Sequence, residues 1–159
     1  HESNIIFQEN FSPLTVFRNI ADESSNLELE AKEAGEKIIV KLLDIGIESR
    51  PCHQDLYHGN FIIYKDETLL IDWEYSSMGD IYFDYADLFW QNEFDHDLDL
   101  RKKTLEEIGI QSIENKEKFE YFEMLSMITW GLWAMRRSSN SPHGKKALNN
   151  AITLLENKN

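Results

Sequence analysis

Hydrophobic residues recur every three or four positions along most of this chain, which is the period of one face of an α-helix. The pattern predicts helices near residues 12–20, 25–46, 82–92, 97–108 and 115–137, and a last one carrying Leu148, Ile152 and Leu155. Between Phe119 and Met135 the chain is apolar almost all round. We therefore expect that helix to be buried on most of its faces.

Several predicted helices begin and end at residues with a known capping role. Ser12 and Pro13 suit the start of the first helix, and Ser25 with Glu28 has the spacing of a capping box. Gly46 stands where the second helix should stop.

One short segment has the pattern of β-strands. The runs FIIY at 61–64 and TLLI at 68–71 are rich in β-formers, and they are separated by three polar residues, which predicts a hairpin. The polar stretches at 51–60 and 72–80, on either side of it, read as loops. The fold class is therefore α+β and mostly helical, and 159 residues suit a single domain, 1–159.

Charge and cysteine content narrow the possible partners. The net charge of −13 disfavours binding to nucleic acid or anionic lipid, and it permits a cationic partner. Cys52 is the single cysteine, so no internal disulfide forms, and this suits the reducing cytosol. With no uncharged apolar run of membrane-spanning length, we expect a cytoplasmic protein without membrane insertion. We assign no role to Cys52 or His58.

The predicted hairpin brings two oxygen-bearing side chains together. Asn60 precedes its first strand and Asp72 follows its second, and an antiparallel hairpin returns the chain to its start. Amide and carboxylate oxygens of this kind suit Mg²⁺, which keeps positions open for phosphate oxygens. Asp55, five residues before Asn60, is placed to accept a proton from a substrate hydroxyl.

These residues also match a longer pattern. His53 to Asn60 reads H-x-D-x-x-x-x-N, the catalytic-loop pattern of kinase-like phosphotransferases, and Asp72-Trp73-Glu74 stands where the metal-binding aspartate motif belongs. Isolated residues of these types more often cap helices and complete turns. A hydrolytic metal site built from His53, Asp55 and His58 is a weaker alternative, because no helical histidine pair accompanies it.

The segment IDWEYSSMGDIYFDYADL and the downstream run Trp130-Gly131-Leu132-Trp133 resemble choline and ethanolamine kinases, especially the bacterial LicA-like choline kinases. The resemblance implies the C-terminal lobe of a protein-kinase-like fold, with the hairpin carrying the catalytic and metal loops. It implies ATP as co-substrate, Mg²⁺, and phosphorylation of the hydroxyl of choline or a related amino alcohol. It also implies that Asp84 supports the catalytic loop and that His53 organises it. Aminoglycoside phosphotransferases share the first motifs without the tryptophan pair.

Aromatic side chains offer a site for a cationic substrate. A quaternary ammonium donates no hydrogen bond, so its recognition depends on aromatic faces and negative charge. Trp130 and Trp133 share a helix face, and Tyr75 follows the metal ligand closely. We expect Trp90, with Tyr82 or Tyr85, to complete this cage, although aromatic pairs at helical spacing are more often core. The acidic residues Glu93, Asp95, Asp97 and Asp99 suit a solvated helix start better than a substrate contact.

A complete kinase also needs a lysine and usually a glycine-rich loop over the ATP phosphates. This sequence has no G-x-G and no run of strands before residue 50. We therefore expect the N-terminal ATP-binding lobe to be missing from these 159 residues, and the chain alone to be inactive. A non-catalytic module that binds a cation or a partner is the alternative of another class.

Overall fold

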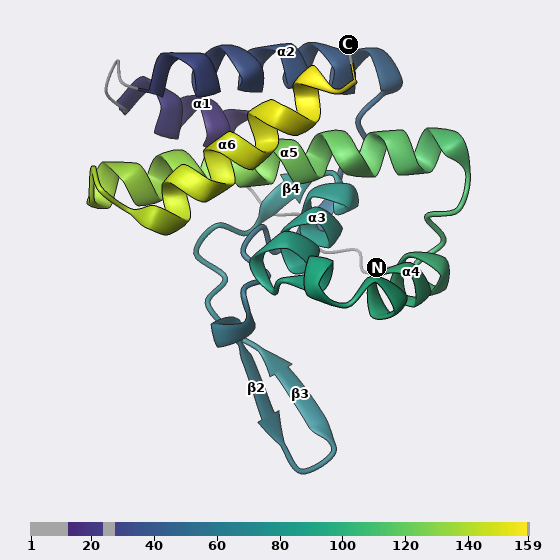
Figure 1. Cartoon of the computed structure of the whole chain (residues 1–159). Helices are drawn as coiled ribbons and strands as arrows, with labels where there is room; N and C mark the ends of the chain where they lie inside the picture. The colour runs from purple at the N-terminus through teal and green to yellow at the C-terminus, as the bar shows by residue number, and fades with distance from the viewer. Residues whose placement is uncertain (1–12, 24–27, 159) are drawn as a thin grey trace.

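One long central helix organises the molecule. The computed structural model describes residues 13–23 and 28–158. Its helices are α1 (Pro13–Glu23), α2 (Leu29–Ile45), α3 (Ile81–Gln91), α4 (Leu98–Glu107), α5 (Ile113–Arg137) and α6 (Pro142–Glu156). α5 crosses the middle of the molecule, with α1 and α2 on one side, α3 and α4 on the other, and α6 across its face (Figure 1).

The helix boundaries follow from their capping residues. Asp80, Asp97, Ser112 and Ser141 each accept a hydrogen bond from a backbone N–H in the first turn of α3, α4, α5 and α6. Pro142 begins α6, where its missing N–H costs nothing. The predicted caps at Ser12 and Ser25 lie outside the described residues, and Glu28, at the start of α2, makes no side-chain capping bond.

Burial of α5 follows the all-round apolar pattern of its sequence. All residues from Lys118 to Leu132 except Glu120 are buried, and they include the charged residues Lys118 and Glu123. Each buried charge has a partner: Lys118 lies 2.7 Å from the Asp80 carboxylate, and Glu123 pairs with Arg101 at 2.7 Å. Pairing removes the large penalty of an isolated buried charge.

Close approach of α5 and α6 depends on a glycine. A Cβ atom placed on Gly131 would lie 2.7 Å from a methyl carbon of Leu148 and 3.3 Å from the carbonyl oxygen of Gly144. A larger residue here would push the Leu148 side chain aside and crowd the backbone of α6. Gly131 sits between Trp130 and Leu132, so the crossing is close to the aromatic residues singled out above.

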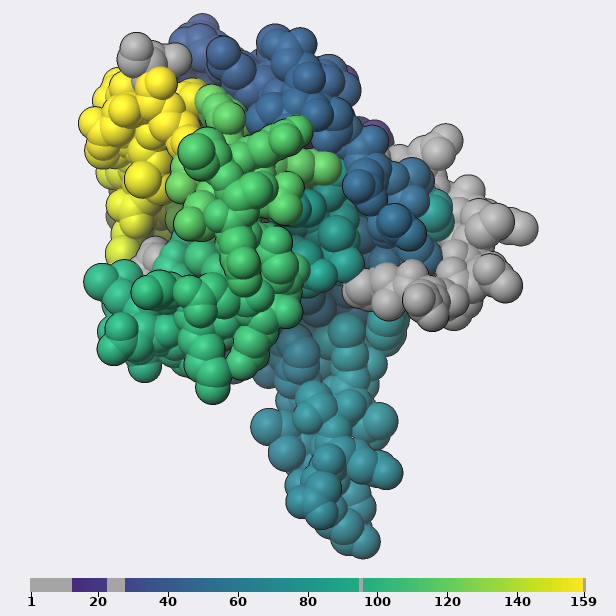
Figure 2. All heavy atoms as spheres, turned by 90° about the vertical axis from the view of Figure 1, so that its right-hand side faces the viewer, coloured from purple at the N-terminus to yellow at the C-terminus, as the bar shows by residue number. Residues whose placement is uncertain are grey.

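Strands form two small antiparallel sheets. The predicted hairpin is present as β2 (Phe61–Tyr64) and β3 (Glu67–Leu70), with Phe61 opposite Leu70 and Tyr64 opposite Glu67. Lys65 has φ 54, the left-handed conformation of a two-residue hairpin turn, so the second strand starts one residue earlier than predicted. The hairpin projects from the helical body (Figures 1 and 2).

The second sheet was not predicted. β1 (Arg50–Cys52) and β4 (Ser77–Gly79) pair with Pro51 opposite Met78, and all but Arg50 lie in the segments 51–60 and 72–80 that the sequence suggested were loops. Each strand has three residues, too few for a period to be visible. Their pairing joins the two ends of the segment that contains the hairpin. None of the described helices is both long and apolar enough to span a membrane.

Candidate active site

The two sheets bring the predicted catalytic and metal loops side by side. The β1–β4 pair holds Cys52 opposite Ser77, so residues 53–60 and 71–76 leave the same point of the fold. At the far end of these loops the backbone N–H of Ile71 donates to the Asn60 carbonyl at 3.0 Å. Asn60, in the short 3-10 helix η2 (His58–Asn60), is therefore the direct neighbour of the residue before Asp72.

His53 lies between the two loops and bonds to both. Its Nε2 lies 2.9 Å from the Ile71 carbonyl oxygen, and its Nδ1 accepts from the Asp55 N–H at 3.3 Å. Its ring also packs edge-on against Trp73, with centroids 4.6 Å apart. This buried imidazole links the two loops.

Asp84 holds the start of the catalytic loop from beneath. Its carboxylate accepts from the backbone N–H of His53 at 2.9 Å and of Gln54 at 2.7 Å. Gln54 has φ 67, a left-handed conformation that is unfavourable for a residue with a side chain. The two bonds to Asp84 offset that cost. The geometry agrees with the supporting role that the resemblance implied for Asp84.

Asp55 is half-buried and firmly oriented. The side-chain nitrogen of Asn60 donates to the Asp55 carboxylate at 2.9 Å and to its backbone carbonyl at 2.9 Å. Burial raises the pKa of the Asp55 carboxyl, hydrogen bonds from Asn60 and Gln91 oppose that effect, and the negative charge of Asp72 adds to it. The charge of Asp72 is thus near enough to act on Asp55.

Asn60 and Asp72 have the chemistry that a magnesium ion requires. Because the Asn60 nitrogen is occupied by Asp55, its amide oxygen is the atom left to bind a cation. Asp72 is exposed and has φ 63, a left-handed conformation that turns the chain directly after the hairpin. Two hard oxygen ligands fit Mg²⁺. Among residues 13–23 and 28–158, no group of three His, Cys, Asp or Glu side chains suits a metal, which counts against the hydrolytic site.

Three of the predicted aromatic residues form one cluster. The Tyr75 ring packs edge-on against Trp130 at 5.3 Å, and Trp130 packs edge-on against Trp133 at 6.1 Å. Asp55 and Glu74 are among the charges that raise the pKa of the Tyr75 hydroxyl, although burial raises it most. The cluster is therefore close enough to the catalytic loop to sense Asp55.

The members of this cluster differ in exposure. Trp130 is 8% exposed, and its indole N–H has no hydrogen-bond partner within the described part of the chain. Trp133 is half-buried, and the Arg137 guanidinium lies over its ring at 4.3 Å. Trp133 is thus only partly buried, with Arg137 over one face of its ring, whereas Trp130 belongs mainly to the core.

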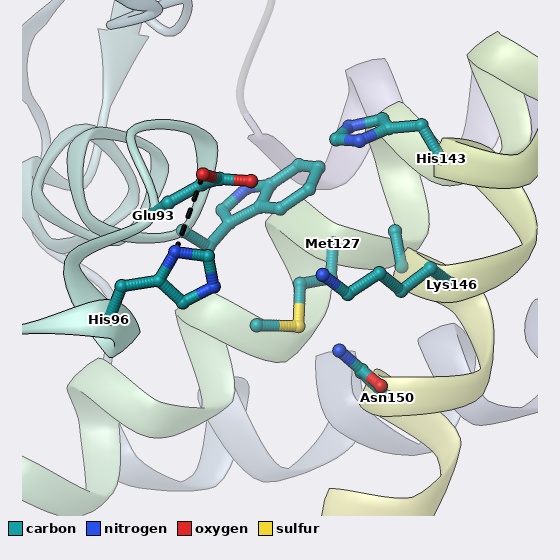
Figure 3. Close-up of a pocket in the computed structure, with 8 residues that line it drawn as sticks. Glu93, His96, Met127, His143, Lys146 and Asn150 are labelled. Atoms are coloured by element: carbon teal, nitrogen blue, oxygen red, sulfur yellow. Dashed lines mark ion pairs between the residues drawn. The ribbon is translucent and has the colours of Figure 1, made fainter.

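Trp90 and the two other tyrosines have ring neighbours outside this cluster. The Trp90 ring stacks on His143 at 5.5 Å and 20°, and it lines a pocket against α6 (Figure 3). Tyr82 lies beside Lys118, about 18 Å along α5 from Trp130 at 1.5 Å per residue. Tyr85 packs against Tyr82. The structure therefore does not bring Tyr82 into the aromatic cluster, and it gives the ring of Trp90 a different neighbour.

A buried polar network under the catalytic loop escaped the sequence analysis. The fully buried Asp87 carboxylate accepts from the Leu56 N–H at 2.8 Å, from Gln91 at 2.8 Å and from the Ser126 hydroxyl at 2.6 Å. Ser126 in turn accepts from the Trp90 indole N–H at 2.6 Å. The signal for this network was present, because Asp84 and Asp87 share one face of an otherwise apolar helix.

Burial changes the pKa of two carboxyl groups beneath the loop. It raises the pKa of Asp87 to about 7 and that of Asp84 to about 6, against the bonds that each carboxylate accepts. Gln54 completes the framework, because its side chain donates to the Tyr75 carbonyl at 3.2 Å and to the Ser77 hydroxyl. The catalytic loop is thus fixed to α3, α5 and the metal loop at once.

Three residues that we do not assign to the site make structural contacts. Asp97 caps α4, as expected for a helix start, by accepting from the Leu100 N–H at 2.9 Å. Cys52 is buried, and burial together with nearby carboxylates raises the pKa of its thiol. The ring of His58 packs against Tyr57 at 4.1 Å.

Comparison with known proteins agrees with this geometry. The model of the phosphotransferase enzyme family matches residues 13–115. Over 89 residues the chain is 34% identical to a LicA homolog of Mycoplasma capricolum, which covers 54% of this chain and 37% of the relative. Over 93 residues it is 31% identical to LicA of Haemophilus influenzae, covering 54% of this chain and 27% of that protein. The chain thus spans well under half the length of these relatives.

Solved structures extend the likeness to the whole fold. A crystal structure of LicA in complex with AMP has a TM-score of 0.81 at 25% identity and covers 100% of this chain and 58% of that one. The choline kinase LicA from Streptococcus pneumoniae has a TM-score of 0.79 at 26% identity, covering 99% and 59%. These neighbours confirm the predicted kinase-like α+β fold. The match over residues 13–115 shows that the chain belongs to the phosphotransferase enzyme family, where it is a choline kinase-like member.

Proposed function

We propose that the protein containing this chain transfers the terminal phosphoryl group of ATP to the hydroxyl of choline or a related amino alcohol. The observation that carries the proposal is the position of Asp55. Its carboxylate accepts a hydrogen bond from Asn60, the charge of Asp72 acts on it, and its own charge acts on Tyr75 of the aromatic cluster, which supports the proposal. A substrate with a hydroxyl two carbons from a quaternary ammonium fits such an arrangement.

Asp55 is the general base in this proposal. A half-buried carboxylate held by Asn60 keeps a fixed direction, and it accepts the proton as the substrate oxygen attacks phosphorus. The bond between the terminal phosphorus and the bridging oxygen breaks, and ADP leaves with that oxygen. Asn60 and Asp72 would hold Mg²⁺, which neutralises phosphate charge when it is bound.

Trp133 and Tyr75 bind the cationic end of the substrate. Their rings meet at Trp130, which packs against both. An aromatic face attracts a quaternary ammonium without a hydrogen bond, and each such contact is worth about 0.5–2 kcal/mol. Asp84, Asp87 and His53 act through the loop backbone, so they position Asp55 without touching the substrate.

The ATP-binding part lies outside this lobe in our proposal. A kinase uses a lysine and a loop above the phosphates, and phosphoryl transfer depends almost entirely on such positioning. We therefore expect residues 1–159 alone to be inactive. Joining them to the N-terminal lobe of the Streptococcus pneumoniae LicA gives a lobe-completed enzyme in which the proposed chemistry is measurable.

A substrate panel tests the proposal. The lobe-completed enzyme should phosphorylate choline or ethanolamine with ATP and Mg²⁺, and Asp55→Asn should lower kcat by about 100- to 10,000-fold. Separately, choline should quench the tryptophan fluorescence of residues 1–159 alone. Phosphorylation of kanamycin without choline would assign the protein to the aminoglycoside kinases. Choline binding without phosphorylation of any panel substrate would favour a non-catalytic module.

A further inference from the structure

Arg137 already occupies one ring face in the aromatic cluster. It lies in the last turn of α5, one turn after Trp133, and its guanidinium carbon is 4.3 Å from the centre of the Trp133 ring. This is the geometry of a cation–π contact, in which a positive charge lies over the face of an indole. The chain therefore places a cation of its own on a ring that the proposed function assigns to the cation of the substrate.

The ring beneath Arg137 is coupled to the rest of the cluster. Trp133 and Tyr75 both pack against Trp130. Burial raises the pKa of the Tyr75 hydroxyl most, and the negative charge of Asp55 adds to that rise. A hydrogen bond from the Trp133 side chain and the positive charge of Arg137 oppose it. The charge of Arg137 thus acts on the same hydroxyl that senses Asp55.

The contact between Arg137 and Trp133 is held weakly. Arg137 is exposed, and none of the ion pairs within residues 13–23 and 28–158 includes it. Arg101 provides a contrast, because it lies over the Phe89 and Phe119 rings and also pairs with the buried Glu123 carboxylate. A cation–π contact at an exposed position is worth little by itself. Arg137 can therefore leave its ring without disturbing the packing of α5.

One face of an indole ring has room for one cation. A substrate cation that uses this face of Trp133 must displace the guanidinium first. We propose that Arg137 is an internal competitor in the acceptor site, which covers Trp133 in the free protein and leaves it when a substrate cation binds. The inference rests on the proposed function, because that function makes Trp133 part of the acceptor site. Such a competitor lowers the apparent affinity by the fraction of molecules whose ring is covered, so it acts on KM and not on the chemical step.

The affinity of residues 1–159 for choline tests this inference without an activity assay. Arg137→Gln keeps a polar side chain and removes the cation, so calorimetry should show choline binding tighter by about two- to fivefold, the strength of an exposed cation–π contact. Arg136→Gln is the matched control, because it removes the same charge from the adjacent exposed position and leaves Trp133 covered. Its affinity should equal that of the unmodified chain. Unchanged or weaker binding to Arg137→Gln would overturn the inference.

Displacement of the guanidinium is observed directly by NMR. In a chain labelled with ¹³C-arginine, the ring current of Trp133 should shift the δ-methylene protons of Arg137 upfield. Saturating choline or tetramethylammonium should return these signals to the position of an arginine free of any ring, while those of Arg136 stay in place. Signals of Arg137 that remain upfield at saturation would contradict displacement, since ligand and guanidinium would then not share the face.

Activity separates this inference from the proposed function. In the lobe-completed enzyme, Arg137→Gln should lower the KM for choline by the same factor with kcat little affected. Turnover of choline with an unchanged KM would overturn the inference and leave the proposed function in place. Displacement of Arg137 by choline in a chain whose lobe-completed form phosphorylates no amino alcohol would leave the competitor in place and refute the proposed function. Absence of choline binding to residues 1–159 and to Arg137→Gln alike would overturn the inference, whatever the enzyme phosphorylates.

Discussion

The side-chain nitrogen of Asn60 donates to two oxygens of Asp55, the backbone carbonyl and the carboxylate, each at 2.9 Å. One side chain therefore has two proposed roles: it orients the base through its nitrogen, and its oxygen faces the cation site. The two roles depend on different atoms, so substitutions can separate them.

Two substitutions of Asn60 should have different effects on the lobe-completed enzyme. Asn60→Ala removes donor and ligand, and we expect kcat to fall by about 100-fold or more with a higher Mg²⁺ requirement. Asn60→Asp restores an oxygen ligand without the donor, so the Mg²⁺ requirement should recover while kcat stays low. Steady-state rates over a Mg²⁺ titration measure both. Full activity of Asn60→Ala would show that Asn60 has neither role.

The two tryptophans should respond differently to truncation because their exposure differs. Trp133→Ala should raise the KM for choline by about tenfold, with the KM for ATP and the stability little changed. Trp130→Ala should instead cost about 3–5 kcal/mol of unfolding free energy, because Trp130 is buried. Choline kinetics and urea denaturation of each variant provide the measurements. A stable Trp130→Ala protein with an unchanged fold would contradict the core assignment.

Asp87 makes stability depend on pH in a defined window. Burial raises its pKa from 3.8 in the unfolded chain to about 7 in the fold, so the folded state binds more protons between these values. Its contribution is therefore complete at low pH and is lost as pH rises through about 7. Asp87→Asn cannot ionise and should remove that part of the decline between pH 4 and pH 8.

Urea denaturation at several pH values measures this effect. Asp84, whose pKa burial also raises, contributes to the same decline, so the slope should flatten in Asp87→Asn without vanishing. Asp99→Asn, at an exposed position of α4, is the control and should keep the original slope. An identical slope in Asp87→Asn would mean that Asp87 is ionised in the fold throughout this range.

Gly131→Ala should loosen the packing of α6 on α5. The added methyl meets Leu148 and the Gly144 carbonyl, and overpacking of this kind costs about 1–3 kcal/mol. Thermal unfolding of the variant measures the cost, and Asn149→Ala on the exposed face of α6 provides the comparison. Unchanged unfolding would show that α6 shifts freely.

Local patterns predicted the elements whose stability is local. The helices have clear periods and capping residues, and the hairpin has two β-rich runs with a tight turn, so they were placed to within a few residues. β1 and β4 were missed because each is only three residues long. Their pairing also joins residues far apart in sequence, from 25 positions for Cys52 and Ser77 to 29 for Arg50 and Gly79. No local pattern encodes such a pairing.

The candidate site also has a part that local sequence spacing predicts and a part that it does not. Asp55, Asn60 and Asp72 follow from the spacing around one hairpin, and the structure brings them together. The neighbours of each tryptophan depend on how α3 packs against α5, where the Trp90 indole N–H donates to the Ser126 hydroxyl. A helical period gives the relative directions of side chains and not their neighbours across a packed interface. The sequence therefore did not predict that the Trp90 ring stacks on His143 of α6.

Pairing of β1 with β4 makes residues 50–79 a loop closed at its base. The catalytic and metal loops lie wholly inside it, while most of the core lies in the helices outside it. Such a segment can open as a unit while α5 and its neighbours stay packed, with its own free energy of opening. Hydrogen exchange at the amides of Ile71 and Asn60 should then be faster than at those of α5. Enzyme inactivation by mild denaturant would precede global unfolding.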